Sequence, residues 1–390
     1  MITLMGLKSF MGDAGKGRFF DIICLIYTVV ILIAGLWPFN FNPVNKAEWL
    51  KNERGIRFYL GQGIVFSPEP LTAREPASEN TAVTIELLIR PDKEPDDAVS
   101  SILTLCRNGQ SDQFILGQWK SELIVRVPVI KAKLQERYHE IAVGGALMKR
   151  MTRLITVSSG KNATDIYIDG MRKKQFSQYA LIRDNQGLSG HLILGVSPVG
   201  TAPWTGSLLG LAIYDRTLNA REVLDHDLAW RQGGKQLLAL ENKPIALYLF
   251  DERSGQRIQN HAGSHNDLLL PATFKPFHRM ILGMPNNDQW FSRTNQMDVI
   301  INILGFIPFG FFLLAWLQQD RNFSAPLAYG VTMLLGCFLS LSIELTQAYL
   351  PTRDSSLLDL LNNILGTAAG MLLLKYTIQI IKRVKSKRLR

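Results

Sequence analysis

Four long stretches of apolar residues constrain this chain more than any other feature of its sequence. Each is close to the roughly 20 residues that an α-helix needs to cross the hydrocarbon core of a bilayer. The long region between the first and second stretches has the mixed composition of a globular domain. We therefore expect a multi-pass membrane protein with helices at 22–41, 299–317, 325–343 and 357–374.

The first apolar stretch could also be a cleavable signal peptide, because Lys8, Lys16 and Arg18 precede it as a basic n-region would. The stretch is longer than a typical signal-peptide core, however. It ends in Trp-Pro-Phe at 37–39, which is typical of an aromatic membrane-interface anchor and not of a small-residue cleavage site. We interpret it as a retained helix.

The distribution of basic residues predicts the orientation of these helices. The formal net charge is +10, and six basic residues lie within the last nine positions, directly after the last apolar stretch. Basic flanks mark the cytoplasmic side and contact anionic lipid, so we expect no nucleic-acid partner. The predicted order is a cytoplasmic N-terminus at 1–18, a first helix at 19–41, an external domain at 46–277, three helices at 298–381 and a cytoplasmic tail at 382–390.

The region 46–277 predicts an all-β domain. Short alternating runs at 84–89, 114–117, 123–127, 153–157 and 191–195 are separated by Gly, Pro, Asn and Asp. Only 218–230 has the pattern of a helix, with Asn219 as its cap. Cys106 is the one cysteine of this region, which excludes a disulfide within it and a zinc site built on cysteines.

Three motifs of this domain occur in a characteristic order. Thr-Ile-Glu at 84–86 leads to Arg-Pro, Ile-Tyr-Ile-Asp-Gly follows at 166–170, and Trp-Thr-Gly-Ser-Leu-Leu-Gly-Leu-Ala-Ile-Tyr follows at 204–214. Asp169-Gly170 predicts a hairpin turn, and Gly206 predicts a bend at a sheet edge. The domain thus resembles the laminin-G-like, concanavalin A-like jelly roll. Residues 247–255 resemble a segment that usually opens this fold, so we hypothesise a permuted version whose two ends meet.

This resemblance implies either binding of glycans or proteins, or hydrolysis of glycans. Glycan hydrolysis needs two carboxylates with a defined separation on one surface. Glu94 and Asp96-Asp97 instead lie in a Pro-containing loop, and Asp165 and Asp169 flank a hairpin. We interpret them as turn and loop residues. No cofactor is predicted; a calcium site stays open as an alternative, without regular ligand spacing to define it.

Polar residues within the apolar segments are costly in a bilayer and usually face a bundle interior or a cavity. Several pairs are four residues apart, which places both members on one face of a helix. We expect them to form a polar ligand pocket that opens outward. Its predicted residues are Asp298, Asn302, Glu344, Gln347, Arg353, Ser355, Asp359 and Asn363, with Ser340 beside them. The alternative is a structural network in which Arg353 pairs with Glu344 or Asp359.

The segment 298–370 resembles the VanZ-like family of membrane proteins, named for a protein linked to glycopeptide (teicoplanin) resistance. The pocket residues carry this resemblance, together with Phe306 and the predicted helix-packing residues Pro308, Gly310, Gly366 and Gly370. The resemblance implies a four-helix transmembrane bundle, with the jelly roll inserted between its first and second helices. It implies no mechanism.

We therefore expect a protein of the bacterial cytoplasmic (inner) membrane with both termini cytoplasmic and the jelly roll outside. Its partners would be membrane lipid and an envelope glycan, glycopeptide or lipid-linked precursor, with a role in glycopeptide (teicoplanin) tolerance. A non-enzymatic role is favoured. The alternatives are a membrane-embedded enzyme acting on a lipid-linked precursor, with Glu344 and Asp359 as acid and base, or a subunit of a polysaccharide or surface-protein assembly system.

Overall fold

A computed structural model of the chain describes residues 13–59, 61–74, 81–95, 98–107, 111–129, 138–183, 187–240, 243–263, 266–284, 293–319, 321 and 323–388. Asp96 and Asp97, positions 1–12 and Arg390, all of which entered the sequence-based predictions, lie outside these residues. The chain divides into two compact units. One comprises residues 1–41 and 279–390, and the other comprises residues 42–278.

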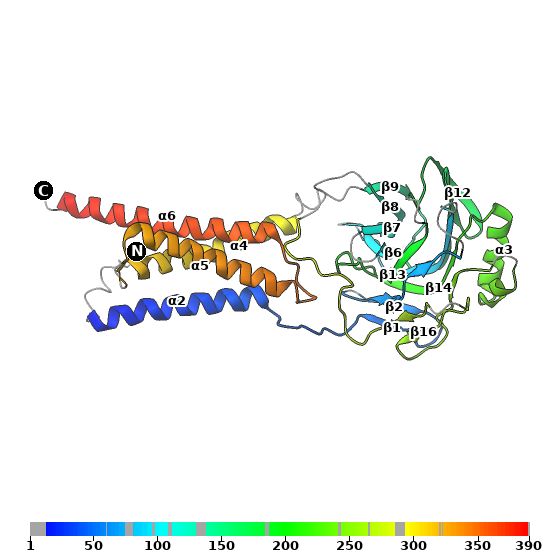
Figure 1. The fold of residues 1–390 in the computed structure, drawn as a ribbon, viewed down its shortest axis with the longest axis horizontal. Helices are drawn as coiled ribbons and strands as arrows, with labels where there is room; N and C mark the ends of the chain where they lie inside the picture. The colour runs from blue at the N-terminus through cyan, green and yellow to red at the C-terminus, as the bar shows by residue number, and fades with distance from the viewer. Residues whose placement is uncertain are drawn as a thin grey trace. The chain divides into compact units, whose positions relative to one another are not determined.

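The first unit is helical (Figure 1). Three of its helices are long and apolar enough to cross a membrane, with candidate spans 296–318, 325–347 and 357–384, and a shorter apolar stretch lies at 20–36. Helix α2 packs against α4 and α5, and both α4 and α5 pack against α6. The helices are α2 (Asp13–Leu36), α4 (Arg293–Gln319), α5 (Ala325–Gln347) and α6 (Leu357–Arg388).

Several helix ends differ from the predictions, among them the C-terminal ends of α2 and α6. The first helix ends at Leu36, so Trp37 and the residues up to Phe41 continue as a turn and a loop. Pro38 explains this end, because proline lacks the backbone donor that a continuing helix needs. The basic tail is not a separate segment as far as it is described, since α6 continues through it to Arg388.

The second unit is a β-sandwich of two antiparallel sheets. Within the described residues, one sheet has the order β1-β2-β14-β5-β10-β11-β12, with β15 also on β14. Its strands are β1 (Ala47–Trp49), β2 (Ile56–Phe58), β5 (Val83–Pro91), β10 (Arg153–Ser159), β11 (Ala163–Ile168), β12 (Met171–Ser177), β14 (Gly206–Tyr214) and β15 (Ala246–Tyr248).

The other sheet has the order β16-β17-β3-β13-β6-β7-β8-β9, with β4 also on β13. Its strands are β3 (Val65–Phe66), β4 (Leu71–Thr72), β6 (Ser100–Arg107), β7 (Ser111–Trp119), β8 (Glu122–Pro128), β9 (Tyr138–Val143), β13 (Ser189–Leu194), β16 (Arg257–Ile258) and β17 (Leu268–Leu269). All five strand runs that the sequence predicted are present.

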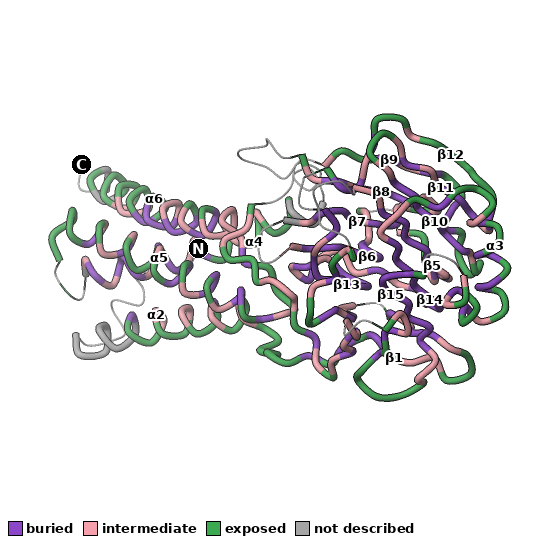
Figure 2. The backbone as a smooth tube through the Cα atoms, turned by 45° about the vertical axis from the view of Figure 1, so that its right-hand side comes forward, coloured by how far each residue is buried: buried purple, intermediate pink, exposed green. Residues whose placement is uncertain are grey.

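The central strands of the first sheet, β5 and β14, are buried on both faces (Figure 2). Along β5, Ile85, Leu87 and Ile89 belong to the core between the two sheets. The opposite face is covered by α3 (Ala220–Arg231), whose Trp230 packs in a second apolar cluster with residues of β10, β11 and β14. The short 3-10 helix η1 (Lys235–Ala239) follows α3. Because side chains alternate along a strand, this cover buries residues that would otherwise face water.

The turn and bend predictions had different outcomes. Asp169 and Gly170 form a two-residue turn between β11 and β12, with φ of 51° and 78°. The explanation given for Gly206 was wrong, because β14 pairs with both β2 and β5 at that residue and is not a sheet edge. A Cβ there would lie 2.4 Å from the indole of Trp204, so the close approach of this ring requires glycine.

The two ends of the sandwich meet, as the permutation hypothesis required. Val44 forms a β-bridge with Thr273, and the amide of Phe274 donates to the carbonyl of Pro43 at 2.8 Å. The buried Asn45 side chain donates to the carbonyls of Ile64 and Pro271. These bonds satisfy backbone groups that the chain ends would otherwise leave buried and unpaired.

Candidate functional site

The predicted polar residues of α5 lie at its C-terminal end, and two of them bond to backbone groups of other segments. The Glu344 carboxylate is 1% exposed, and its Oε2 accepts a hydrogen bond from the amide of Ser356 at 2.8 Å. The Gln347 side chain donates through Nε2 to the carbonyl of Gly35 in α2, also at 2.8 Å. These bonds connect α5 to the loop before α6 and to the end of α2.

The start of α6 brings the remaining polar residues of the bundle to the same end. Asn363 Nδ2 donates to Ser340 Oγ of α5 at 2.9 Å, and both side chains are buried. Asn302 of α4 hydrogen-bonds the carboxylate of Asp359, which is half-buried. We call Asn302, Ser340, Glu344, Gln347, Asp359, Asn362 and Asn363 the polar cluster of the helices.

Several buried atoms of the polar cluster have no hydrogen-bond partner within the described part of the chain. They are Gln347 Oε1, Asn362 Nδ2 and Asn363 Oδ1. Their residues are 9%, 4% and 3% exposed. A buried polar atom without a partner costs free energy, roughly 1–3 kcal/mol, so these three atoms have hydrogen-bonding capacity for water or a ligand.

Three of the predicted pocket residues do not belong to the polar cluster. Arg353 is exposed, and its Nε donates to the carbonyl of Trp37 at 2.9 Å; among the described residues it forms no ion pair with Glu344 or Asp359. Asp298 is exposed. Ser355 is buried, and its Oγ accepts a hydrogen bond from the amide of Leu282 at 3.0 Å.

The predicted packing residues lie where α4 and α6 cross. A Cβ at Gly366 would lie 2.4 Å from the carbonyl oxygen of Ile303, and one at Gly370 would lie 2.1 Å from that of Ile307. A Cβ at Gly310 would lie 2.2 Å from the carbonyl oxygen of Thr367. The two backbones therefore touch, as small residues allow in membrane helices. Pro308 lies inside α4 between these contacts.

Sequence reasoning did not identify the backbone partners of the cluster. Gly35 and Trp37 supply carbonyls from the end of α2, and Gly283 donates its amide to the carbonyl of Ser355. Backbone groups leave no signal in a sequence, since every residue has them. Asn362 was also missed, although its neighbour Asn363 was recognised through its spacing from Asp359.

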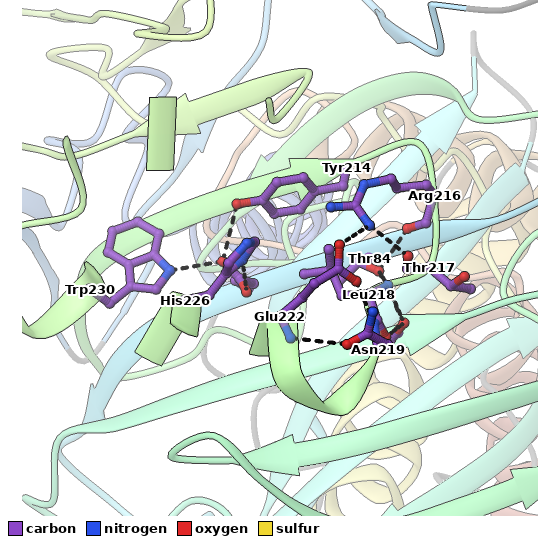
Figure 3. Close-up of polar contacts among 11 residues, drawn as sticks. Thr84, Tyr214, Arg216, Thr217, Leu218, Asn219, Glu222, His226 and Trp230 are labelled. Carbon is purple, nitrogen blue, oxygen red and sulfur yellow. Dashed lines mark hydrogen bonds and ion pairs between the residues drawn. The ribbon is translucent and has the colours of Figure 1, made fainter. Parts of the chain in front are cut away.

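The sandwich has a different buried polar group, centred on Glu86 of β5. This residue is 0% exposed and accepts hydrogen bonds from His226 Nδ1 at 2.8 Å and Trp230 Nε1 at 2.9 Å, both from α3. Tyr214 donates to the same carboxylate at 3.4 Å. Figure 3 shows the Tyr214, His226 and Trp230 side chains converging on one point between α3 and the sheet. We interpret Glu86 as a structural link, because it is sealed from solvent.

The start of α3 is fixed by a second set of polar contacts, also drawn in Figure 3. The Asn219 side chain accepts hydrogen bonds from the amides of Arg221 and Glu222, and Glu222 in turn accepts one from the amide of Asn219. This capping box confirms Asn219 as the helix cap.

The other carboxylates considered in the sandwich form hydrogen bonds or ion pairs in its turns and loops. Asp169 accepts hydrogen bonds from Arg153 and from the amide of Leu154. Asp165 is paired with Arg172 at 3.5 Å across the same hairpin. Glu94 accepts a hydrogen bond from the amide of Lys149 at 3.3 Å. None of these contacts forms the closely spaced carboxylate pair that glycoside hydrolysis needs.

Two family models match this chain. Residues 69–224 match the concanavalin A-like lectin/glucanases superfamily, through its laminin-G-like model. Residues 245–381 match the VanZ/LLP1 model. This second match begins before the first helical residue of α4 and within the unit that forms the sandwich. No curated protein matches the chain.

Solved structures match part of this chain at low identity. A SAP-like pentraxin from Limulus polyphemus is 13% identical over 46% of this chain and 78% of its own, with a TM-score of 0.32. The CBM40 of a Ruminococcus gnavus sialidase, bound to α2,3-sialyllactose, is 13% identical over 44% and 96%, with a TM-score of 0.34. Trypanosoma rangeli sialidase with sialic acid is 17% identical over 49% and 30%, with a TM-score of 0.35.

Scores this low carry no inference about this chain. The three apolar helices and the VanZ-like match indicate a membrane protein, and the sandwich is a domain of the carbohydrate-binding type. As the motifs predicted, the chain combines a laminin-G-like, concanavalin A-like domain with a VanZ-like domain.

Proposed function

We propose that this chain is a non-enzymatic protein of the bacterial cytoplasmic membrane that binds envelope glycans or their lipid-linked precursors. In this proposal α2 belongs to the bundle as its first transmembrane helix. Tyr27 of α2 stacks on Phe312 of α4 at 5.3 Å, and Gly35 of α2 packs closely on Ile343 of α5. The sandwich at 46–277 is then an insertion between the first and second helices of a bundle completed by 298–381.

Charges at the two ends of the helices support the orientation. The end of α6 carries Lys382 and Arg383, and Arg321 lies between α4 and α5. Basic residues of short loops favour the cytoplasmic side. The polar cluster lies at the opposite helix ends, from which the chain continues into the sandwich. We therefore place the sandwich and the polar cluster on the outer side of the membrane.

The polar cluster carries the proposal for a ligand in the membrane. Gln347 Oε1 and Asn363 Oδ1 are acceptors and Asn362 Nδ2 is a donor, and all three are buried without partners. Exposed Arg353 lies beside them in sequence and offers a cation for an anionic group. The hydroxyls of a sugar would hydrogen-bond to the three unpartnered atoms, and the phosphate of a lipid carrier would pair with Arg353. The sandwich would bind the glycan part outside the bilayer.

The test uses full-length protein in lipid nanodiscs, titrated with an undecaprenyl-linked sugar and with the same sugar free in solution. Ser340→Ala and Asn363→Leu should weaken binding of the lipid-linked sugar at least tenfold. Ser342→Ala is the matched control, because its hydroxyl bonds only to Phe338 of its own helix. Equal affinity of all three variants and the wild type would contradict a site in the polar cluster.

Two other results would redirect the proposal. Turnover of the lipid-linked sugar that disappears in Glu344→Gln would instead identify a membrane-embedded enzyme with Glu344 and Asp359 as acid and base. Absence of binding and of turnover would favour a subunit of an assembly system. A role in glycopeptide tolerance predicts that deleting the gene lowers the teicoplanin concentration that stops growth, and that Asn363→Leu fails to restore it.

A further inference from the structure

A cluster of possible metal ligands lies in the sandwich, in the loops that follow β15 and β16. Asp251 and Glu252 lie between β15 and β16, and His261 lies in the next connection, between β16 and β17. One ligand atom from each of the three side chains can be chosen so that all lie within 4.8 Å of one another. The cluster forms where the chain passes from the first sheet, through β15, to the second, through β16.

Two atoms of this cluster are buried without a hydrogen-bond partner in the described structure. They are Glu252 Oε2 and His261 Nε2. The other oxygen of Glu252 is already used, because it accepts a hydrogen bond from the amide of Gln259 at 2.6 Å. His261 Nε2 lies 3.6 Å from Asp251 Oδ1, which is too long for a hydrogen bond. The polar atoms thus face one another without bonding directly.

These distances are those of ligands around a shared ion. Two ligand atoms bound to one zinc at about 2.0–2.2 Å each, at the tetrahedral angle, are roughly 3.3–3.6 Å apart. The Asp251–His261 separation meets this value, and a carboxylate oxygen of Glu252 lies within 4.8 Å of a ligand atom of each of these two residues. The backbone is held in place, because the amide of His261 donates to the carbonyl of Leu247 at 2.8 Å.

We propose that Asp251, Glu252 and His261 bind a divalent transition-metal ion, with zinc as the leading candidate. The imidazole nitrogen selects a first-row transition metal over calcium, which prefers an all-oxygen shell. Three protein ligands leave a fourth position for water or for a group of a bound molecule. The ion would tie the segment that follows β15 to the segment that follows β16 and so fix the crossing between the sheets.

Lys235 provides an internal test of the proposal. Its Nζ lies 3.7 Å from Asp251 Oδ2, and its side chain is 72% exposed. In the absence of metal this cation partly neutralises the Asp251 carboxylate. An ion at the site would compete with it, and Lys235 can move into solvent. Removing this charge should therefore strengthen metal binding, whereas removing a ligand should weaken it.

The experiment uses tag-free full-length protein in nanodiscs, stripped with chelator and titrated with Zn²⁺ by calorimetry. His261→Gln and Asp251→Asn should each weaken zinc binding about 100-fold or more, since even outer-shell changes cost 10–100-fold. Lys235→Met should tighten binding several-fold. His139→Gln is the matched control, because His139 is an exposed histidine of β9 that contacts Arg183. Calcium should not displace the zinc.

A second measurement separates loss of a ligand from misfolding. Zinc at about 100 times its dissociation constant should raise the unfolding temperature of the wild type by about 5 °C or more. The metal-free His261→Gln protein should unfold near the wild-type temperature and show no such shift. Absence of zinc binding by the wild type, or equal binding by His261→Gln, would show that the three residues form only a network of charges.

Discussion

Because α4 and α6 cross closely, we expect that adding a single methyl group at Gly370 destabilises the protein. In Gly370→Ala the new Cβ would lie 2.1 Å from the carbonyl oxygen of Ile307 and 2.8 Å from the amide nitrogen of Phe311. Both atoms belong to the backbone of α4, so neither can rotate away. The two helices would have to separate.

The size of this effect follows from the distances. Carbon–oxygen contacts between helices are about 3.3–3.6 Å, so α4 and α6 would move apart locally by more than about 1 Å. Overpacking a tightly packed contact costs about 1–3 kcal/mol, and a clash against rigid backbone belongs at the upper end of that range. Alanine regains up to about 1 kcal/mol through its helix propensity. The expected net loss in the free energy of unfolding is about 2 kcal/mol.

The assay is equilibrium unfolding of the full-length protein in mixed micelles with increasing SDS, monitored by helical circular dichroism. Gly330→Ala in α5 and Gly305→Ala in α4 are matched controls, because no atom lies within 4 Å of the Cβ that either change adds. Both controls should be neutral or slightly stabilised. A Gly370→Ala protein as stable as the two controls would refute the close crossing of α4 and α6.

Three further changes test the sandwich. Glu86→Ala leaves the buried donors of α3 without an acceptor. The unfolding midpoint in denaturant should therefore fall by the equivalent of about 3 kcal/mol or more. An unchanged midpoint would show that Glu86 does not stabilise the fold. Asn219→Ala should cost about 1 kcal/mol by the same measurement, through loss of the cap. Burial, and then the nearby His191, lower the pKa of His278, so the folded state binds its proton less well than the unfolded state. Stability should therefore fall as the pH drops below about 6.5, the ordinary histidine pKa, and His278→Asn should flatten this part of the profile.

The periodic features of the fold were predictable from the sequence. Alternating apolar runs predicted the strands β5, β7, β8, β10 and β13. Alternation of apolar and polar residues puts the apolar side chains on one face of a strand, and this holds whichever strands are its neighbours. Long apolar stretches gave α4, α5 and α6, because burial in lipid needs an uninterrupted helix. The cap at Asn219 and the turn at Asp169 follow from local bonding that needs no distant partner.

The polar cluster was predictable only in part. Spacing four residues apart suggested that Asn302, Glu344 and Asn363 face inward, and the structure places these side chains at the same end of the helices. The partners of these residues were not predictable. Arg353 bonds to the carbonyl of Trp37 and not to a carboxylate, because the loop geometry decides which acceptor lies within reach.

The sequence by itself therefore determined the positions of the apolar helices, the strands and the family of each domain, since these depend on local periodicity and motif order. Tertiary structure decided which side chains lose contact with water. Glu86 alternates with core residues and would face solvent on a bare sheet, yet α3 covers it completely. Gly206 is required by the Trp204 ring, and Gly370 by the backbone of α4. Each of these outcomes depends on a surface brought from elsewhere in the chain, which no local pattern contains.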